Sequence, residues 1–212
     1  MRIVIISDTH NRHNQIEVPD GDVLIHCGDA TSVGKVEEIE NFNKWLLKQP
    51  HKHKIFIAGN HDKLFEDNPR KAEVRITGAI YLRDSFIMIN GLKFYGSPWQ
   101  PRFFDWAFNL DRGEAIKKKW NLIPIDTNVL ITHGPPSGIL DYSPYGFSKA
   151  GCEDLLEAVE RIKPRLHCFG HFHSGYGMQS KIWENGQETI FVNGAIVGED
   201  YKVRNKPIAV DL

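Results

Sequence analysis

The sequence has little of what would set it apart from ordinary globular proteins of a reducing compartment. Its 212 residues include only three cysteines, an odd number at distant positions, which excludes a disulfide framework. No stretch approaches the roughly 18 consecutive apolar residues of a membrane-spanning helix. The apolar run at the N-terminus breaks after a few residues, too early for a secretion signal. We therefore predict a cytoplasmic protein with buried free thiols and no association with a membrane.

An excess of positive charge is also lacking. Lys and Arg number 26 against 27 for Asp and Glu, a formal net charge of −1. A protein that binds nucleic acid through its phosphates usually carries a basic excess, so we predict no dedicated nucleic-acid surface. The length suits one domain, residues 1–212, and neither an internal repeat nor a linker interrupts it.

Short apolar runs alternate with helical periodicity, which predicts an α/β fold on a mixed sheet. Five runs have the length and composition of buried strands: 2–6, 22–27, 54–58, 128–132 and 165–169. Two Asn-Gly dipeptides indicate hairpins, joining 85–89 to 92–96 and 178–183 to 188–192, and 207–212 is a plausible last strand. Helices are expected over 35–48, about 112–120, and from Cys152 to Ile162, with Ser148 as N-cap and Pro164 as the stop.

Polar turns containing Gly, Asp, Asn and His follow the five predicted strands. They are Ser7–His10, Gly28-Asp29, Gly59–Asp62, Thr132–Pro135 and Gly170–His173. Ligands of open α/β sheets bind outside the carboxyl ends of the strands. If these strands are roughly parallel neighbours, all five turns converge on one rim, and their side chains form a single site.

Imidazoles, carboxylates and one amide make up the side chains of these turns. The candidates are Asp8, His10, Asp29, Asn60, His61, His133, His171 and His173. Such donors suit Zn, Mn, Fe, Co or Ni rather than Ca²⁺. Without His61, seven donors are too many for one tetrahedral ion but serve two ions that share a carboxylate. Two such ions clamp an in-line displacement and activate a bridging water. Each of these turns alone is common in loops, but all five in this order, each at the end of a strand, indicate a functional site.

The ordered motifs Asp8-x-His10, Gly28-Asp29, Gly59-Asn60-His61-Asp62, His133 and Gly170-His171-x-His173 resemble the calcineurin-like metallophosphoesterase superfamily. Longer phrases, such as Gly96–Pro101 and Gly170–Gly177, are similar to the small MPPED-type branch, which is related to the class III cyclic-nucleotide phosphodiesterases. The resemblance implies an αββα sandwich, with two mixed sheets flanked by helices and a dinuclear site at the sheet rim.

The resemblance also implies roles for these residues. One metal would be held by Asp8, His10, Asp29 and His173, and the other by Asp29, Asn60, His133 and His171. Asp29 would bridge the two ions, and Asn60 would also contact the phosphoryl oxygens. His61 would be the acid beside the leaving group, with Asp62 as its orienting partner, although many relatives carry Glu at the position of Asp62.

Several neighbouring residues are candidates for substrate binding. Trp99 and Phe104 lie in an aromatic segment, 98–108, that either stacks a base or ring beside the metals or packs on itself over the sheet edge. Arg12 and His13 follow the first ligand turn and either contact substrate phosphate or form a solvated loop end. Tyr176, between two glycines, has the same two interpretations.

These observations predict a dinuclear phosphoesterase that binds two divalent transition-metal ions (Mn, Fe, Zn, Ni or Co). We expect a phosphodiesterase for small esters, cyclic nucleotides among them, in which a metal-bridging hydroxide attacks in line. No arginine follows Gly28-Asp29 as it does in protein Ser/Thr phosphatases, and the length leaves no room for the capping domain of the repair nucleases. A phosphomonoesterase and a metal-binding, non-catalytic scaffold of the same fold are the alternatives.

Overall fold

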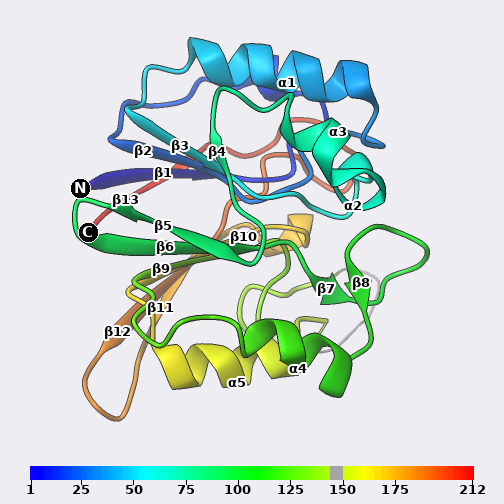
Figure 1. Cartoon of the computed structure of the whole chain (residues 1–212). Helices are drawn as coiled ribbons and strands as arrows, with labels where there is room; N and C mark the ends of the chain where they lie inside the picture. Colours follow the sequence, from blue (N-terminus) through cyan, green and yellow to red (C-terminus); the bar gives the residue numbers. More distant parts are fainter. Residues whose placement is uncertain (144–149) are drawn as a thin grey trace.

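Two large β-sheets lie face to face between two layers of helices in the computed structural model, which describes residues 1–143 and 150–212 (Figure 1). The first sheet has the strand order β13-β1-β2-β3-β4: Ile208–Asp211, Arg2–Ile6, Val23–His26, His53–Phe56 and Ile80–Tyr81. The second has the order β11-β12-β10-β9-β6-β5: Gly177–Ile182, Glu188–Asn193, Leu166–Phe169, Val129–Thr132, Leu92–Ser97 and Ser85–Ile89. This confirms the αββα sandwich.

Helices cover the outer face of each sheet. The first sheet carries α1 (Val36–Lys48), α2 (Leu64–Asp67) and α3 (Pro69–Glu73), and the second carries α4 (Glu114–Trp120) and α5 (Glu153–Ile162) (Figure 1). Single turns of 3-10 helix lie at His13–Gln15 and His173–Gly175, and a small ribbon pairs β7 (Gln100–Pro101) with β8 (Asn109–Leu110). None of the helices in the described ranges is long and apolar enough to cross a membrane.

Both faces of the central strands are buried, which explains their unbroken apolar runs. In β1, Ile3 and Ile5 point into the core between the sheets, while Val4 and Ile6 point into the core beneath the helices. The α1 helix meets that second core with the apolar stripe that its periodicity predicts, including Phe42. All three cysteines are buried free thiols, as expected.

Most predicted elements are present, with bounds shifted by a residue or two. Asn90 and Gly91 both have positive φ, 50° and 80°, as a type I′ hairpin turn requires. At α5 the prediction needs correction: the N-cap is Cys152, whose sulfur accepts from the amide of Leu155. Ser148 lies outside the described residues.

The five motif-bearing strands belong to two sheets, which corrects the expectation of neighbours at one rim. Strands β1, β2 and β3 are parallel in the first sheet, and β9 and β10 are parallel in the second. The two rims meet nevertheless. The amide of Ser7, after β1, donates to the carbonyl of Gly194, after β12, at 2.8 Å. The turns therefore face each other across the gap between the sheets.

Candidate metal centre

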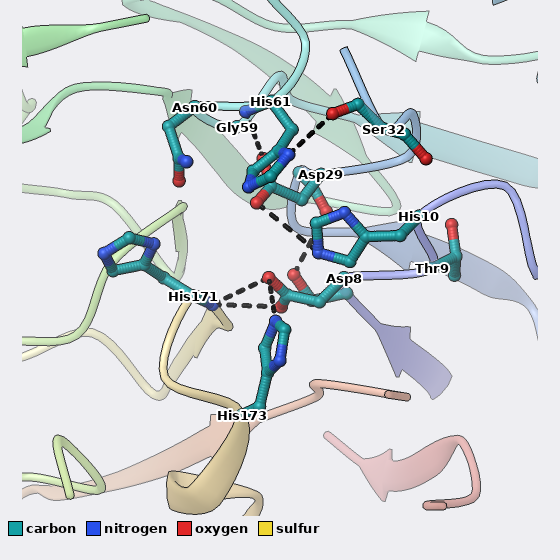
Figure 2. A network of polar contacts seen from close by, with 12 residues as sticks. Asp8, Thr9, His10, Asp29, Ser32, Gly59, Asn60, His61, His171 and His173 are labelled. Carbon is teal, nitrogen blue, oxygen red and sulfur yellow. Dashed lines mark hydrogen bonds and ion pairs between the residues drawn. The ribbon is translucent and has the colours of Figure 1, made fainter. Parts of the chain in front are cut away.

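The seven predicted donors gather where the two rims meet. Figure 2 labels all of them except His133. Six of the seven form two clusters, Asp8 with His10 and His173, and Asp29 with His133 and His171. Within each cluster the candidate ligand atoms lie within 4.8 Å of one another. The seventh, Asn60, joins the second cluster, because its Oδ1 lies 2.9 Å from Nε2 of His133. Each sheet contributes to both clusters.

Asp29 lies between the two clusters. Its Oδ2 is 3.7 Å from Nε2 of His10 and 3.4 Å from Nε2 of His133. A third, overlapping cluster joins His10 and Asp29 to His61. One carboxylate therefore reaches imidazoles of both clusters, which is the placement that a bridging ligand needs.

The backbone around the clusters is held in an unusual conformation. Four of the seven donors have positive φ: Asp8 at 53°, His10 at 39°, Asp29 at 55° and His171 at 68°. Each such residue costs on the order of 1–3 kcal/mol, and strain of this kind concentrates at functional sites. Gly170 allows the close approach, because a Cβ there would lie 2.0 Å from Oδ2 of Asp8.

Hydrogen bonds behind the donors fix their orientation. His133 donates from Nδ1 to the carbonyl of Cys27 at 2.9 Å, and His173 donates from Nδ1 to the carbonyl of Gly198 at 3.1 Å. The carboxylate of Asp8 accepts from the amide of His171 at 2.9 Å (Figure 2). In His133 and His173 the other ring nitrogen, Nε2, is therefore left to bind a metal ion, which is the usual arrangement for metal-binding histidines.

The donor set fits a cation. Both ring nitrogens of His10 are buried without a hydrogen-bond partner among the described residues. The ring of His133 lies between two acceptor oxygens, the carbonyl of Cys27 and Oδ1 of Asn60. A neutral imidazole has one N–H, so one of these contacts sets lone pair against lone pair. A proton on the ring, a metal ion at Nε2 or a rotated Asn60 amide resolves that conflict.

The electrostatics favour the ligand forms of Asp8, Asp29, His10 and His171. Burial alone raises the pKa of Asp8 and Asp29, but the charge and hydrogen bond of His173 for Asp8, and of His133 for Asp29, hold both below the usual range. Burial lowers the pKa of His10 to about 4 and that of His171 to about 3. Ionised carboxylates and neutral imidazoles are the states that bind metal.

His173 and His133 differ from His10 and His171, because both have a raised pKa. At His173 burial lowers the pKa, but the hydrogen bond and charge of Asp8 outweigh burial. The same balance holds at His133. Burial lowers its pKa, but the charge and hydrogen bond of Asp29 outweigh burial and raise it to about 9. Without a metal its ring is therefore protonated at neutral pH, and metal binding there must release a proton.

His61 lies beside both clusters, and its ring is held from behind. Its Nδ1 donates to the carbonyl of Ser32 at 2.7 Å, and its backbone amide donates to Oδ1 of Asp29 at 2.8 Å (Figure 2). The Nε2 atom is thus the one available to the adjoining pocket. This nitrogen faces the site but is not one of the seven predicted metal ligands, so it can carry a proton.

Asp62 does not orient His61, which corrects the prediction. Its carboxylate accepts from the amides of Ala30, Thr31 and Gly59 and from the hydroxyl of Thr31, at 2.7 to 3.3 Å. Burial and the charge of Asp29 raise its pKa to about 6. The carboxylate therefore fastens the turn after β2 to the turn after β3, and the Ser32 carbonyl takes the orienting role.

Replacing Asp62 with Asn is expected to lower the free energy of unfolding by about 1–3 kcal/mol, because the new amide group must face a backbone N–H. The ratio of activity on alkyl and aryl esters should be unchanged, because His61 keeps its Ser32 contact. Chemical denaturation and paired kinetics measure the two quantities. Asp67→Asn, the same change at an exposed position in α2, is the control. A changed ester ratio at full stability would restore the orienting role.

A pocket of about 540 Å³ opens beside the clusters, and it contains one of the five residues predicted to bind substrate. Its lining includes Asp29, Asn60, His61, His171, His173, Phe103, Phe104, Trp106, Phe172, Tyr201, Ser143 and Glu199. Phe104 is 77% exposed and offers a free ring surface. Among the residues that the structure describes, neither Lys nor Arg lines this pocket.

The other four substrate candidates lie elsewhere. Trp99 is nearly buried and donates from Nε1 to the carboxylate of Asp84, so it packs the loop as the alternative interpretation predicts. His13 is buried against α1, where Nε2 pairs with Asn41 at 2.9 Å. The hydroxyl of Tyr176 donates to the carbonyl of Lys206 at 3.0 Å. Arg12 is exposed and is not part of the pocket lining.

Six residues of the described pocket lining were not predicted as site residues: Phe103, Trp106, Ser143, Phe172, Glu199 and Tyr201. The ring of Tyr201 lies edge-on to His10 at 4.9 Å and to His173 at 5.4 Å between centroids. Glu199, two residues earlier, accepts from the hydroxyl of Ser174. Trp106 stacks on His61. The aromatic segment signalled Trp106 in general terms, whereas no local motif marks 199–201.

Comparisons with known proteins agree with this site. The family model described as calcineurin-like phosphoesterase matches residues 1–175. Metallophosphoesterase domain-containing protein 1 of Homo sapiens is 42% identical over 235 residues, spanning 100% of this chain and 71% of the human protein. UPF0046 protein K07C11.7 of Caenorhabditis elegans is 40% identical over 222 residues, spanning 98% of this chain and 74% of its own length.

A solved structure supports the fold. The protein TT1561 of Thermus thermophilus superposes with a TM-score of 0.58 at 15% identity, covering 90% of this chain and 88% of that one. The family model, the relatives and the fold agree with the geometry of the two His/Asp clusters. The chain belongs to the calcineurin-like phosphoesterase family, in its small metallophosphoesterase branch.

Proposed function

We propose that this protein is a dinuclear, metal-dependent phosphodiesterase for small esters that carry a base or another ring, cyclic nucleotides among them. The observation that supports this most is the placement of Asp29 between two His/Asp clusters beside an aromatic pocket. Asp8, His10, Asp29 and His173 would hold one ion, and Asp29, Asn60, His133 and His171 the other. Two bound ions supply a water of lowered pKa and neutralise charge on the phosphoryl oxygens.

The chain's own side chains would do the rest. His61 presents Nε2 to the pocket and would protonate the departing alkoxide, a contribution on the order of 10²–10⁴ in rate. The Ser32 carbonyl holds the ring for that transfer. The amide of Asn60 would contact a phosphoryl oxygen. Phe104 offers a face on which a base can stack.

The preference for diesters rests on charge. A phosphomonoester is a dianion at neutral pH, and enzymes that select it usually add an arginine clamp. The described part of the pocket lining offers no such clamp and carries the carboxylate of Glu199. A monoanionic diester suits it better. The cytoplasm is the compartment we propose, in keeping with the free thiols.

Elemental analysis and a substrate panel test the proposal. The purified protein should contain about two transition-metal ions per chain and hydrolyse bis(nitrophenyl) phosphate and cyclic nucleotides faster than nitrophenyl phosphate and nucleoside monophosphates. A chelator should abolish both activities, and returning metal should restore them. Monoester turnover higher by tenfold would establish the phosphomonoesterase instead. Full metal content without any turnover would indicate the scaffold.

A further inference from the structure

The indole of Trp106 lies face to face with the imidazole of His61. The ring centroids are 4.0 Å apart and the planes are 26° from parallel. The other contacts of the His61 imidazole do not fix the orientation of its ring plane. Nδ1 donates one hydrogen bond to Ser32, and His10 meets the ring edge-on at 4.6 Å. A single hydrogen bond at one ring atom allows the ring plane to swing about it, so a flat surface against the face supplies the missing constraint.

Trp106 is itself fixed from two directions. The ammonium of Lys63 lies 4.7 Å from the centre of its ring. The backbone amide of Ala107 donates to the carbonyl of Asn60 at 3.2 Å, which ties the aromatic segment to the turn that carries His61. Because this tie is made by the backbone, it persists when the side chain at position 106 is replaced.

We infer that Trp106 is a positioning residue: its indole holds the imidazole of His61 in the orientation that directs Nε2 into the pocket. The kinetic consequence rests on the proposed function, in which His61 is the leaving-group acid. Proton transfer depends steeply on orientation, and a misplacement of about 1 Å can cost 10²-fold in rate. Trp106 would act through His61, without contact with the reacting atoms.

The competing role for Trp106 is to stack the base of a substrate. One face of the indole is already in contact with His61, and the ammonium of Lys63 also lies over the ring. Phe104, two residues earlier, is 77% exposed and is available for a base. The two residues therefore divide the tasks, and they make a matched pair for experiment: Trp106→Leu removes the surface against His61, and Phe104→Leu removes the surface offered to substrate.

The first measurement is spectroscopic and independent of turnover. Ring protons that lie over an indole face resonate upfield, so the His61 ring signals in the ¹H–¹³C spectrum of the full chain loaded with Zn²⁺, which is diamagnetic, should be upfield-shifted. We expect Trp106→Leu to move these signals downfield, Phe104→Leu to leave them in place, and Trp106→Phe to keep most of the shift. His61→Asn assigns the signals. Unmoved signals in Trp106→Leu would overturn the inference.

The second measurement is kinetic. Trp106→Leu should lower kcat on ribose-linked diesters by about 10- to 10²-fold, with bis(nitrophenyl) phosphate affected less than about threefold, and Trp106→Phe should recover most of the loss. Phe104→Leu should instead raise KM for nucleotide esters. Equal losses on both ester types, or a rise in KM alone for Trp106→Leu, would contradict positioning. If His61→Ala shows no dependence on the leaving group, the proposed acid role fails, while the spectra still decide whether Trp106 stacks on the ring, the contact on which positioning depends.

Discussion

Replacing His61 with Ala is expected to slow the hydrolysis of ribose-linked phosphodiesters by roughly 10²–10⁴-fold while sparing most activity on nitrophenyl diesters. An alkoxide is a poor leaving group and needs a proton in the transition state, whereas a nitrophenolate leaves as a stabilised anion. The ring of His61 is held through Nδ1 on the Ser32 carbonyl, so Nε2 is the atom that would deliver this proton. The measurement is the ratio of kcat/KM for the two ester types.

Two controls make this result specific. His61 also belongs to a cluster with His10 and Asp29, so the metal content of the variant must match that of the original protein. A loss of metal would make His61 a ligand rather than the acid. Changes at Asn60 or His133, by contrast, should reduce both ester types alike. If His61→Ala lowers both by one common factor at full metal content, the acid role is wrong.

How far the sequence could predict this site is clearest at the strand ends. A buried strand followed by Gly, Asp or His is a local pattern, and the donors it marks do meet, although the rims of two sheets contribute them instead of one. Which sheet each strand joins is decided by pairing between distant segments. The local sequence of β1 or of β9 therefore could not predict that the two strands belong to different sheets.

Sequence neighbours of ligands were the weaker predictions. Asp62 follows His61, yet its carboxylate accepts from Ala30 and Thr31 after β2 and from Gly59 in its own turn, because four buried donors outweigh one imidazole. His13 follows the first ligand turn, but a single 3-10 turn directs it against α1. Side-chain direction after a turn depends on φ and ψ values that composition does not specify.

The aromatic segment shows the same limit. Trp99 and Trp106 have similar surroundings in the sequence, but only Trp106 reaches the pocket. Phe104, with a φ of 47°, turns the chain between them. Tyr201, like Glu199, comes from a segment that follows β12 and carries no motif. Its role depends wholly on the tertiary fold.

Replacing Asp29 with Asn is expected to be the most damaging change among the seven donors. The substitution keeps the size of the side chain and a carbonyl that accepts from the amide of His61, but it removes the negative charge that faces His10 and His133. Both clusters lose a ligand at once. Metal content should fall from about two ions per chain to below one. Mutation of residues that only support metal ligands typically lowers activity by about 10- to 100-fold, and we expect a larger loss for Asp29→Asn.

Asp8→Asn provides the matched comparison, because Asp8 belongs to one cluster only. Metal present at about 100 times its dissociation constant stabilises a protein by about 2.7 kcal/mol per site, or about 5–10 °C in Tm for a chain of this size. Each variant is measured against its own metal-free Tm, which removes any direct effect of the substitution on folding. We expect two increments for the original protein, one for Asp8→Asn and almost none for Asp29→Asn. An Asp29→Asn protein that keeps a full increment or one intact ion would show that the clusters bind independently, and that Asp29 does not bridge them.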